Sequence, residues 1–566
     1  MRGGIAVTVF IALVLATAAP AQAAQRVYVS DSGNGDVAVA PINEETGALG
    51  AALTPVATTG NNNEAIAFTP NGSQLFTGDG TGISRFAVDA GTGALTGPTA
   101  TATTSGYGVV VTPNSSFIYQ AGGGDIYAFA LNADGTIGAP VPGSPFTPAS
   151  YPDGLAVTPD GKYLYSANNN DSTVGAFSIA ANGALTELTG SPYAVSGAPY
   201  AISLTPDGKR LYVPSRNVAP NRVYAYDIGS SGALTPVVGS PFNQNAGVAN
   251  SFGSTVTPDG KYLFTANFNS ADVSGFSIAA SGALTELAGS PYSLPGTSPA
   301  ALTTDADGSH LYVEDNNSGN VYAFSLGANG VPSALAGSPF SVGATGDFQS
   351  IVLNPDQPPV AKVTSKVSGK SASFNATGST DDGAITRYLW DYGDGKTQDT
   401  TSAKPSHKYS KNGIYTATVQ VFDENGCSTT YVAAGQTPFC NGGPGAVAST
   451  TVKISNSDGK KPELKVDVKK KQKLGKPIKV KVESATGVRV TAATTQAKLK
   501  GASEKKVTYK GATTNIGKNG KGKLTLKIKR REAKISKGAE SGKVKVKLTA
   551  ANNAGTSKKT LKIKLK

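Results

Sequence analysis

The 566-residue sequence is poor in several residue types on which whole classes of protein depend. It contains two His, two Cys, one Met and one Trp, and charged residues make up only 16% of it. Two His exclude a metal site built from several imidazoles, and two Cys allow one intrachain disulfide at most. So small a charged fraction argues against a helical enzyme rich in Glu and Lys. The 68 Gly, with many Thr, Val and Tyr, instead predict an all-β fold of short strands and tight turns.

Long hydrophobic runs are also missing, with one exception at the N-terminus. Residues 5–16 are almost wholly apolar, follow the positive charge of Arg2 and precede the small-x-small cleavage pattern Ala21-Gln22-Ala23. We therefore expect residues 1–23 to be a signal peptide, the alternative being an uncleaved membrane anchor. No later segment reaches the roughly 18 apolar residues of a transmembrane helix, so no transmembrane segment is expected. The expected location is secreted or extracellular, with association to the cell envelope left open.

The net charge of +13 is the average of two unlike parts. Residues 462–566 contain 31 Lys and Arg against 6 Asp and Glu, a net charge of +25. The remainder of the chain is acidic, with a net charge of −12. This asymmetry concerns partners and solubility rather than the fold.

Residues 26–356 repeat a pattern of four strand-like pieces. The first piece ends in a turn such as Thr-Pro-Asp-Gly, the second begins Lys-Tyr-Leu-Tyr, and a loop rich in Asn and Asp leads to the others. An aromatic residue in the second piece recurs at intervals of 43 to 52 residues, at Tyr28, Phe76, Tyr119, Tyr165, Tyr212, Phe264 and Tyr312. A period in the forties with four strands per repeat predicts the blades of a β-propeller.

The two ends of the repeat region complement each other. The first copy begins at Arg26, already in its second strand, whereas residues 350–356 match a first strand that no second strand follows. We expect these two pieces to pair in one blade. The prediction is a seven-bladed β-propeller over residues 24–357 with no open sheet edge.

When the repeats are aligned on the turn proline, they have similar residues at the positions expected to pack and different residues at one position near it. Five residues before the proline every repeat has a small residue, as crowded strands near an axis require. Six residues before it the repeats differ, with Glu64, Tyr107, Asp153, Tyr200, Phe252, Ala300 and Gln349. These residues begin the innermost strands, at the mouth of the central channel, where Arg216 and Arg222 lie on a neighbouring loop. We interpret Glu64, Tyr107, Asp153, Tyr200, Phe252, Gln349, Arg216 and Arg222 as ligand-binding candidates, the alternative being that strand ends tolerate variation.

The loops between second and third strands are rich in Asn and Asp, for example residues 168–172 and 267–272. Clustered oxygens of this kind are Ca²⁺ ligands, but no loop has a regular Asp-x-Asp-x-Asp-Gly spacing. Asn and Asp are also the residues that turns use. We predict no metal and no cofactor.

Two motifs carry a family resemblance over residues 26–356. The stretches at 164–168 (Leu-Tyr-Ser-Ala-Asn) and 263–267 (Leu-Phe-Thr-Ala-Asn) resemble the Tyr-Val-Thr-Asn repeats of bacterial surface propellers. The Thr-Pro-Asp-Gly-Lys-Tyr-Leu-Tyr pattern is similar to the seven-bladed lactonase family, which implies His, Glu and Arg in the channel. The only histidine of the repeats, His310, belongs to a turn on the opposite face, and no base accompanies the two arginines. We therefore assign no catalytic residue.

Residues 358–456 resemble a polycystic kidney disease (PKD) domain, an immunoglobulin-like β-sandwich. The resemblance rests on Trp-Asp-Tyr-Gly-Asp-Gly at 390–395, Ser-His-Lys-Tyr at 406–409 and Gly-Ile-Tyr-Thr-Ala-Thr-Val at 413–419. It implies a spacer or a module that binds protein or carbohydrate, with Trp390 in the core and His407 as a packing or hydrogen-bonding group. In an exported protein Cys427 and Cys440 are expected to form a disulfide, since a dithiol redox site favours Cys-x-x-Cys spacing.

Residues 457–566 alternate Lys with apolar residues, as in Ile478-Lys479-Val480-Lys481-Val482. This period of two predicts a second Ig-like β-sandwich with lysines outside and apolar residues inside. Tyr509 is its only aromatic residue, so a stacking platform for nucleic acid is not expected. The expected partner is anionic cell-envelope material, the alternative being a charged face that only keeps the strands soluble.

Together these features predict a secreted, non-catalytic binding, adhesion or cell-surface protein, a monomer that recognises a carbohydrate or protein ligand at the propeller mouth. The alternative is an extracellular lactonase-like hydrolase or isomerase acting at the channel mouth. A third reading is a purely structural coat component.

Overall fold

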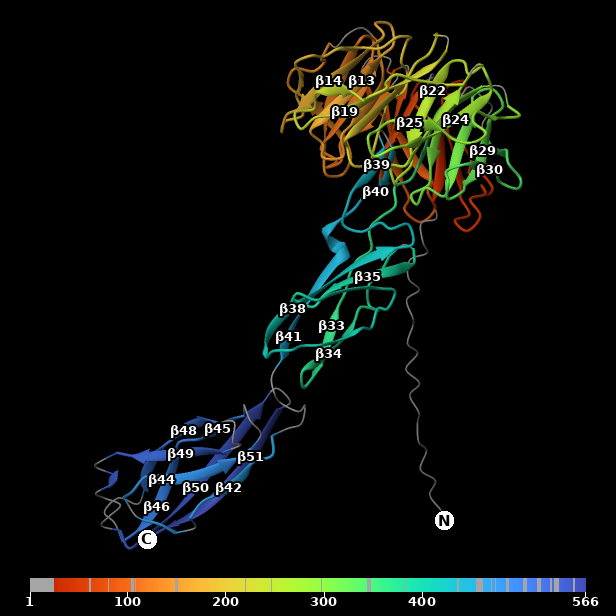
Figure 1. Cartoon of the computed structure of the whole chain (residues 1–566). Helices are drawn as coiled ribbons and strands as arrows, with labels where there is room; N and C mark the ends of the chain where they lie inside the picture. Colours follow the sequence, from red (N-terminus) through yellow and green to blue (C-terminus); the bar gives the residue numbers. More distant parts are fainter. Residues whose placement is uncertain are drawn as a thin grey trace, which may run out of the picture. The chain divides into compact units, whose positions relative to one another are not determined.

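The computed structural model describes residues 25–566 except 61–62, 80, 103–105, 107, 148–150, 219, 246, 297, 344–347, 382, 435–436, 455–461, 470, 474, 485–487, 502–505, 517–520, 530–531, 534–538 and 553–554. The expected signal peptide therefore lies outside the described residues. Strands make up almost all of the regular structure (Figure 1), so the all-β prediction is confirmed. No helix in the described part of the chain is long and apolar enough to cross a membrane.

The described chain forms two compact units. The first extends to Val360 and also includes Thr380–Arg387 and Val421–Ala446, and the second comprises Ala361–Ser379, Tyr388–Gln420 and Val447–Lys566. The expected middle domain, residues 358–456, is therefore divided between the two units, and its Val432 and Phe439 pack against the propeller.

The propeller of the first unit consists of seven antiparallel sheets, the blades. Blade 1 is β32 (Phe348–Leu353), β1 (Arg26–Asp31), β2 (Asp36–Pro41) and β3 (Val56–Ala57). Blade 2 is β4 (Ala65–Phe68), β5 (Gln74–Asp79), β6 (Gly82–Val88) and β7 (Leu95–Ala102), and blade 3 is β8 (Gly108–Val111), β9 (Phe117–Gly122), β10 (Asp125–Leu131) and β11 (Ile137–Pro140). Blade 4 is β12 (Pro152–Val157), β13 (Tyr163–Asn168), β14 (Thr173–Ile179), β15 (Leu185–Glu187) and β16 (Tyr193–Ala194).

The remaining three blades repeat this arrangement, again with a short fifth strand. Blade 5 is β17 (Ser203–Leu204), β18 (Arg210–Pro214), β19 (Arg222–Ile228), β20 (Leu234–Pro236) and β21 (Phe242–Asn243). Blade 6 is β22 (Ser251–Val256), β23 (Tyr262–Asn267), β24 (Asp272–Ile278), β25 (Leu284–Glu286) and β26 (Tyr292–Ser293). Blade 7 is β27 (Pro299–Thr304), β28 (His310–Asp315), β29 (Asn320–Leu326), β30 (Pro332–Ala334) and β31 (Phe340–Ser341).

The first and last parts of the repeat region meet in blade 1. Strand β1 pairs with β32 so that Val27 faces Leu353 and Val29 faces Ile351. Their side chains are buried in one cluster with Tyr312 and Val321 of blade 7. This pairing joins strands more than 300 residues apart and leaves no free inner edge between blades 7 and 1.

The innermost strands approach one another so closely that small residues are required. A Cβ atom added at Gly154 of β12 would lie 2.5 Å from the Tyr200 carbonyl oxygen of the next blade. One added at Gly253 of β22 would lie 2.5 Å from the Ala300 carbonyl oxygen. The small residues that precede the turn prolines are therefore structural: they let neighbouring strands crowd around the axis.

Residues 421–446 form a disulfide-linked extension of the first unit, with strands β39 (Val432–Ala434) and β40 (Thr437–Cys440) and the short 3₁₀ helix η1 (Pro444–Ala446). Phe439 is buried in one cluster with Tyr212 and Val256 of the propeller. Cys427 and Cys440 form a disulfide with their Cα atoms 5.5 Å apart. Burial of an aromatic side chain among propeller residues explains why this segment belongs to the first unit.

The PKD-like part has two main sheets. One contains β33 (Thr364–Ser368), β34 (Ser371–Asn375) and β37 (Ser406–Lys408), and the other β36 (Thr397–Thr400), β35 (Ile385–Asp391), β38 (Gly413–Asp423) and β41 (Val447–Ile454). Trp390 is fully buried and packs against Phe374, as expected for a core residue. His407 stacks on Tyr392, and its Nε2 lies 2.9 Å from the Asp394 carboxylate. These contacts fit the packing role expected for His407.

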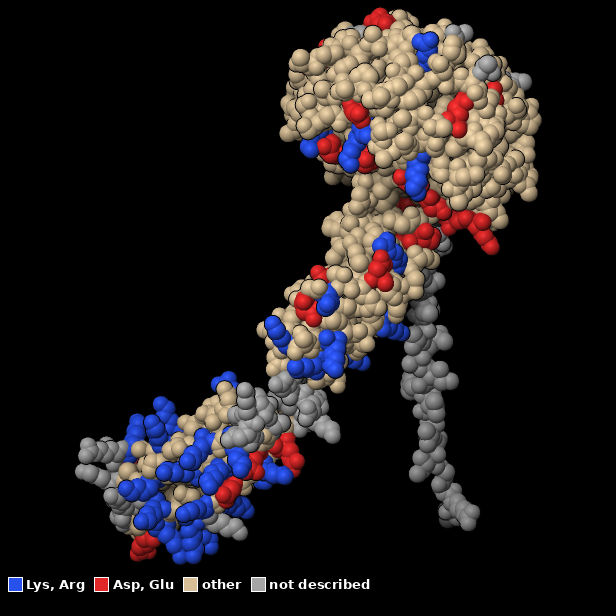
Figure 2. All heavy atoms as spheres, in the orientation of Figure 1, with Lys and Arg blue, Asp and Glu red and all other residues tan. Residues whose placement is uncertain are grey.

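The Lys-rich part forms ten hydrogen-bonded strands around one apolar core. They are β42 (Lys465–Asp467), β43 (Lys471–Gln472), β44 (Ile478–Glu483), β45 (Arg489–Ala492), β46 (Thr495–Lys500), β47 (Lys506–Lys510), β48 (Ala512–Asn515), β49 (Lys521–Ile528), β50 (Ser541–Asn552) and β51 (Gly555–Leu565). Burial alternates along β44, where Ile478, Val480 and Val482 are buried and the lysines between them are exposed. Figure 2 shows the resulting concentration of basic side chains on this part of the chain.

Candidate functional site at the channel mouth

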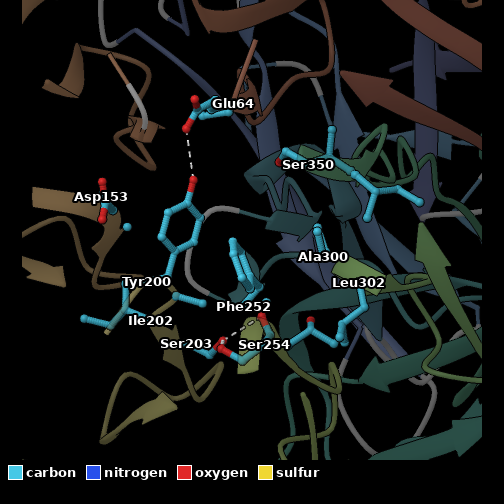
Figure 3. A pocket seen from close by; sticks show the side chains of 18 residues that line it. Glu64, Asp153, Tyr200, Ile202, Ser203, Phe252, Ser254, Ala300, Leu302 and Ser350 are labelled. Carbon is cyan, nitrogen blue, oxygen red and sulfur yellow. Dashed lines mark hydrogen bonds between the residues drawn. The ribbon is translucent and has the colours of Figure 1, made fainter. Parts of the chain in front are cut away.

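One cavity at the mouth of the propeller channel is lined by the first residues of the innermost strands (Figure 3). Its volume is about 100 Å³. The residues that line it come from six blades and include Glu64, Asp153, Tyr200, Phe252, Ala300 and Ser350. The repeat register therefore gathers side chains from distant parts of the sequence around one small space.

Glu64 and Tyr200 interact directly across the mouth. The Tyr200 hydroxyl donates a hydrogen bond of 3.0 Å to Glu64 Oε2. Burial raises the pKa of Glu64, and the hydrogen bond from Tyr200 partly offsets this rise. Burial also raises the pKa of Tyr200 far above its usual range, so Tyr200 remains a neutral donor. The hydrogen bond fixes both groups, and the Tyr200 oxygen and the Glu64 carboxyl remain able to accept from a ligand.

Among the described carboxylic acids that line the cavity, Asp153 has the most strongly shifted pKa. Its side chain is only 8% exposed. Burial raises the pKa of Asp153 to about 7; the hydrogen bond with Asn169 and the charge of Arg216 oppose this rise, and the charge of Glu64 adds to it. At neutral pH Asp153 is thus present in both protonation states and can donate or accept a hydrogen bond.

Tyr200 and Phe252 line the other side of the cavity, and the guanidinium group of Arg216 stacks on their rings. The guanidinium carbon of Arg216 lies 3.7 Å from the centroid of the Phe252 ring and 5.1 Å from that of Tyr200. The Phe252 ring also packs on Phe268, with centroids 4.7 Å apart. Burial lowers the pKa of Arg216, and its Nε is buried with no hydrogen-bond partner in the described part of the chain. A guanidinium group that stacks on aromatic rings and has an unused hydrogen-bond donor is suited to binding an oxygen of a ligand.

The structure places the predicted residues in different ways. Glu64, Asp153, Tyr200, Phe252 and Ala300 line the cavity, and Arg216 contacts two of these rings. Tyr107 lies outside the described residues, and Gln349 belongs to β32 but its side chain is not described. Arg222 begins β19, where its main-chain nitrogen donates to Ser215 Oγ, and it is not among the described residues of the cavity wall.

Sequence reasoning missed two groups of the site. Ser203 and Ser254 line the cavity deeper in the strands, with their hydroxyl oxygens 2.7 Å apart. Ser254 carried a signal, since it is the one polar residue at a position where the other repeats have a large apolar side chain. Asp153 was identified as a candidate, but its altered pKa was not, because burial and neighbouring charges are properties of the folded chain.

His310 and the described cluster of potential metal ligands both lie outside the lining of the cavity. His310 Nδ1 lies 2.5 Å from Asp305 Oδ2, and this hydrogen bond raises the pKa of His310. Among the described residues, Asp356, Asp423 and Cys427 offer three potential metal-ligand atoms close together. The Cys427 sulfur is committed to the disulfide and cannot act as a thiolate ligand.

Two family models match the chain. The lactonase family, described as a seven-bladed β-propeller, matches residues 139–240 and 181–332. The PKD domain matches residues 356–436.

Solved propellers superpose on the chain at low identity. A putative 6-phosphogluconolactonase from Bacteroides uniformis has a TM-score of 0.50 and 19% identity, covering 59% of this chain and 100% of that one. The periplasmic gluconolactonase PpgL of Pseudomonas aeruginosa has a TM-score of 0.50 and 16% identity, covering 58% and 99%.

Curated relatives match only through a short segment. The pre-pro-metalloprotease PrtV of Vibrio cholerae is 44% identical over 73 residues, 13% of this chain and 8% of that protein. The microbial collagenase of Vibrio alginolyticus is 40% identical over 76 residues, 13% of this chain and 9% of that protein. The chain thus spans less than a tenth of the length of these relatives. Fold, repeats and family matches agree: the chain contains a seven-bladed β-propeller of the lactonase type followed by a PKD domain.

Proposed function

We propose that this protein works outside the cytoplasm as a binding protein, and that its propeller mouth recognises one sugar-sized unit of a carbohydrate. The observation that carries the proposal is the combination of the Glu64–Tyr200 pair, Asp153 and the Phe252–Arg216 stack around one cavity. Hydroxyl groups of a sugar both donate and accept hydrogen bonds. The mouth offers both, because Glu64 and Asp153 have raised pKa values and Tyr200 stays protonated.

The size of the cavity supports a small ligand unit. Sites for drug-sized ligands measure roughly 300–1,000 Å³, whereas this cavity measures about 100 Å³. A terminal sugar or a similar polar ring is therefore favoured over an extended segment. The exposed part of the Phe252 ring can pack against the apolar face of such a ring, and the Arg216 guanidinium stacks on the Phe252 ring.

Location outside the cytoplasm is supported by two features of the chain. The N-terminal pattern of residues 1–23 is that of a signal peptide. The disulfide between Cys427 and Cys440 is stable in oxidising compartments and rare in the cytosol.

A second candidate function is hydrolysis of a sugar lactone, and Asp153 favours it. A pKa of about 7 suits a general base at neutral pH, since the carboxylate is then available to take a proton from water. Two of the similar solved structures are named as a putative 6-phosphogluconolactonase and a gluconolactonase. Their names indicate a cyclic sugar ester as ligand, which is close in size and chemistry to the terminal sugar proposed above. In this reaction Asp153 would accept a proton from water as the water oxygen bonds to the carbonyl carbon, and would pass that proton to the ring oxygen when the ring ester C–O bond breaks.

One experiment with the full chain separates these functions. Glycan-array binding and lactone hydrolysis are measured for the wild type and for Tyr200→Phe and Asp153→Asn. Recognition predicts at least roughly tenfold weaker binding for Tyr200→Phe, since the half-buried Glu64 carboxyl is no longer held in place and the Tyr200 oxygen is lost as an acceptor. Hydrolysis predicts turnover that Asp153→Asn abolishes.

The matched control is Tyr163→Phe, which removes a hydroxyl that donates to the Ser230 carbonyl oxygen and does not line the cavity. It should leave binding unchanged. Absence of any glycan or lactone ligand, or equal losses in Tyr200→Phe and Tyr163→Phe, would refute the proposed site.

A further inference from the structure

Five exposed lysines form a row across the Lys-rich sheet. Cross-strand pairing places Lys506 opposite Lys498, Lys498 opposite Lys543, Lys543 opposite Lys564, and Lys564 opposite Lys471. The row therefore crosses β47, β46, β50, β51 and β43 in that order. Neighbouring strands are roughly 4.8 Å apart, so five lysines extend over about 20 Å. We call this set the lysine row.

No described carboxylate forms an ion pair with the lysine row, and Glu532, which contacts β47, accepts a hydrogen bond from the Thr508 nitrogen. All five lysines are exposed, and none has an ion pair with a described Asp or Glu. The five strands of the row contain no acidic residue at all. A second pair, Lys545 opposite Lys562, stands beside the row on the same face. Like charges directly opposite each other destabilise a sheet, so the row lowers the stability of this fold.

In strands β42, β44 and β49, by contrast, several lysines lie opposite carboxylates rather than opposite other lysines. There Glu483 lies between Lys465 and Lys521 in the cross-strand pairing, and Asp467 lies opposite Lys481. Lys521 Nζ is 3.9 Å from Glu483 Oε1. This part of the same domain interleaves charges of both signs, with one like-charged pair, Lys481 opposite Lys523. A solubilising role alone does not explain why the five lysines face one another without a carboxylate in the cross-strand pairing.

We propose that the lysine row is a docking surface for a linear anionic polysaccharide with a carboxylate on successive sugars. Such a chain lies across the strands, and its repeating unit is about as long as the spacing between strands. The attraction is charge complementarity, since each Lys presents a compact, mobile positive charge. The proposal is independent of the channel mouth, because it concerns other residues and another ligand chemistry.

Other anionic partners fit the surface less well. No large hydrophobic side chain is exposed in the described part of residues 462–566, so nothing there inserts into a membrane. Tyr509, the only aromatic residue, is fully buried and cannot stack on a nucleic-acid base. Strand twist rotates successive lysines about the row, which a flexible single chain follows more easily than a rigid duplex.

The test uses the full chain and polygalacturonate as the probe. The row variant replaces Lys471, Lys498, Lys506, Lys543 and Lys564 by Gln. The control variant replaces Lys465, Lys479, Lys481, Lys521 and Lys523 by Gln, which removes the same charge from β42, β44 and β49. A third variant replaces the row lysines by Arg. Affinity is measured at about 0.15 M salt, where exposed charges more than about 8 Å apart are largely screened.

We expect the row variant to bind at least about tenfold more weakly and the control and Arg variants to stay within about threefold of wild type. Fully methyl-esterified polygalacturonate, which is uncharged, should not bind. Equal losses in the row and control variants would overturn the proposal, because they would indicate diffuse attraction by net charge. Tighter binding of duplex DNA or of phosphatidylserine vesicles than of polygalacturonate would also overturn it, as would no binding by the wild type.

Discussion

At the scale of single residues, Asp153 is a carboxyl group at the propeller mouth that is buried and only partly neutralised. The carboxyl group is buried by neighbouring blades, and Glu64 adds a second negative charge near it. Arg216 offsets this only in part, since its guanidinium lies over the Phe252 ring and forms no ion pair with Asp153 in the described structure. A buried acid that is not fully neutralised costs stability in its charged form and is a common feature of binding and catalytic sites.

The pKa of Asp153 predicts a pH dependence with a definite sign. Its folded-state pKa of about 7 lies above the ordinary value of 3.8, so the folded state binds more protons between these two values. The contribution of Asp153 to stability is therefore full below about pH 4 and is lost as the pH rises through about 7. Asp153→Asn, which cannot ionise, should match the wild type near pH 3, below the ordinary pKa, and exceed it at pH 8 by on the order of 1–3 kcal/mol.

Scanning calorimetry of the propeller transition at the two pH values measures this difference. Glu187→Gln, which changes an exposed carboxylate on β15, is the control and should shift neither value. A Asp153→Asn variant that is less stable than the wild type at pH 8 would show that Arg216 stabilises the carboxylate after all.

At the scale of elements, the blades are linked by one repeated hydrogen bond. A tyrosine in the second strand of one blade donates to a glycine carbonyl oxygen in the next blade. The pairs are Tyr28–Gly93, Tyr119–Gly183, Tyr165–Gly232, Tyr212–Gly282 and Tyr312–Gly47. Two blades have phenylalanine at the same position, Phe76 and Phe264, so the hydroxyl stabilises the ring without being necessary for a blade to form.

Tyr312→Phe tests the pair that joins the last blade to the first. The hydroxyl of Tyr312 donates to Gly47 over 3.1 Å, and its side chain is fully buried. Removing it leaves a buried carbonyl oxygen without a partner, so unfolding of the propeller should become easier by about 1–2 kcal/mol. Tyr163→Phe, which removes an exposed hydrogen bond, should cost less than about 0.5 kcal/mol. The two values come from calorimetry, and equal losses would contradict a special role for the buried pair.

Sequence periodicity is sufficient to predict the elements but not the contacts between them. The spacing of Tyr28 and its counterparts locates every blade, because each blade must bury the same aromatic side chain. The register of the turn prolines also identifies Glu64, Asp153, Tyr200 and Phe252 as mouth residues. The position of Arg216 over Phe252 could not be predicted, because it depends on a loop conformation. The assignment of Phe439 to the propeller core could not be predicted either, since apolar burial between distant segments leaves no local pattern.

At the scale of the whole molecule, the dominant feature is the separation of charge. Residues 462–566 have a net charge of +25 and the rest of the chain −12. Alternation of Lys and apolar residues in the sequence predicts that the lysines are exposed. It does not predict that five of them align, because alignment depends on the register of five strands. The same alternation also produces the mixed-charge arrangement of β42, β44 and β49.

Charge separation predicts that salt acts differently on the two parts of the chain. Repulsion between aligned lysines destabilises the Lys-rich domain, and salt screens this repulsion because the side chains are exposed. Raising NaCl from about 0.02 M to 0.5 M, where the screening length falls from about 20 Å to below 5 Å, should therefore raise the melting temperature of that domain by several degrees. The propeller transition should move less, because its tyrosine–glycine hydrogen bonds and apolar clusters carry no net charge. Calorimetry of the full chain at both salt concentrations measures the two shifts. The variant with Gln at all five positions of the lysine row should lose most of the salt effect and should melt at a higher temperature in low salt. A salt effect of unchanged size in that variant would show that the lysine row is not the source of the repulsion.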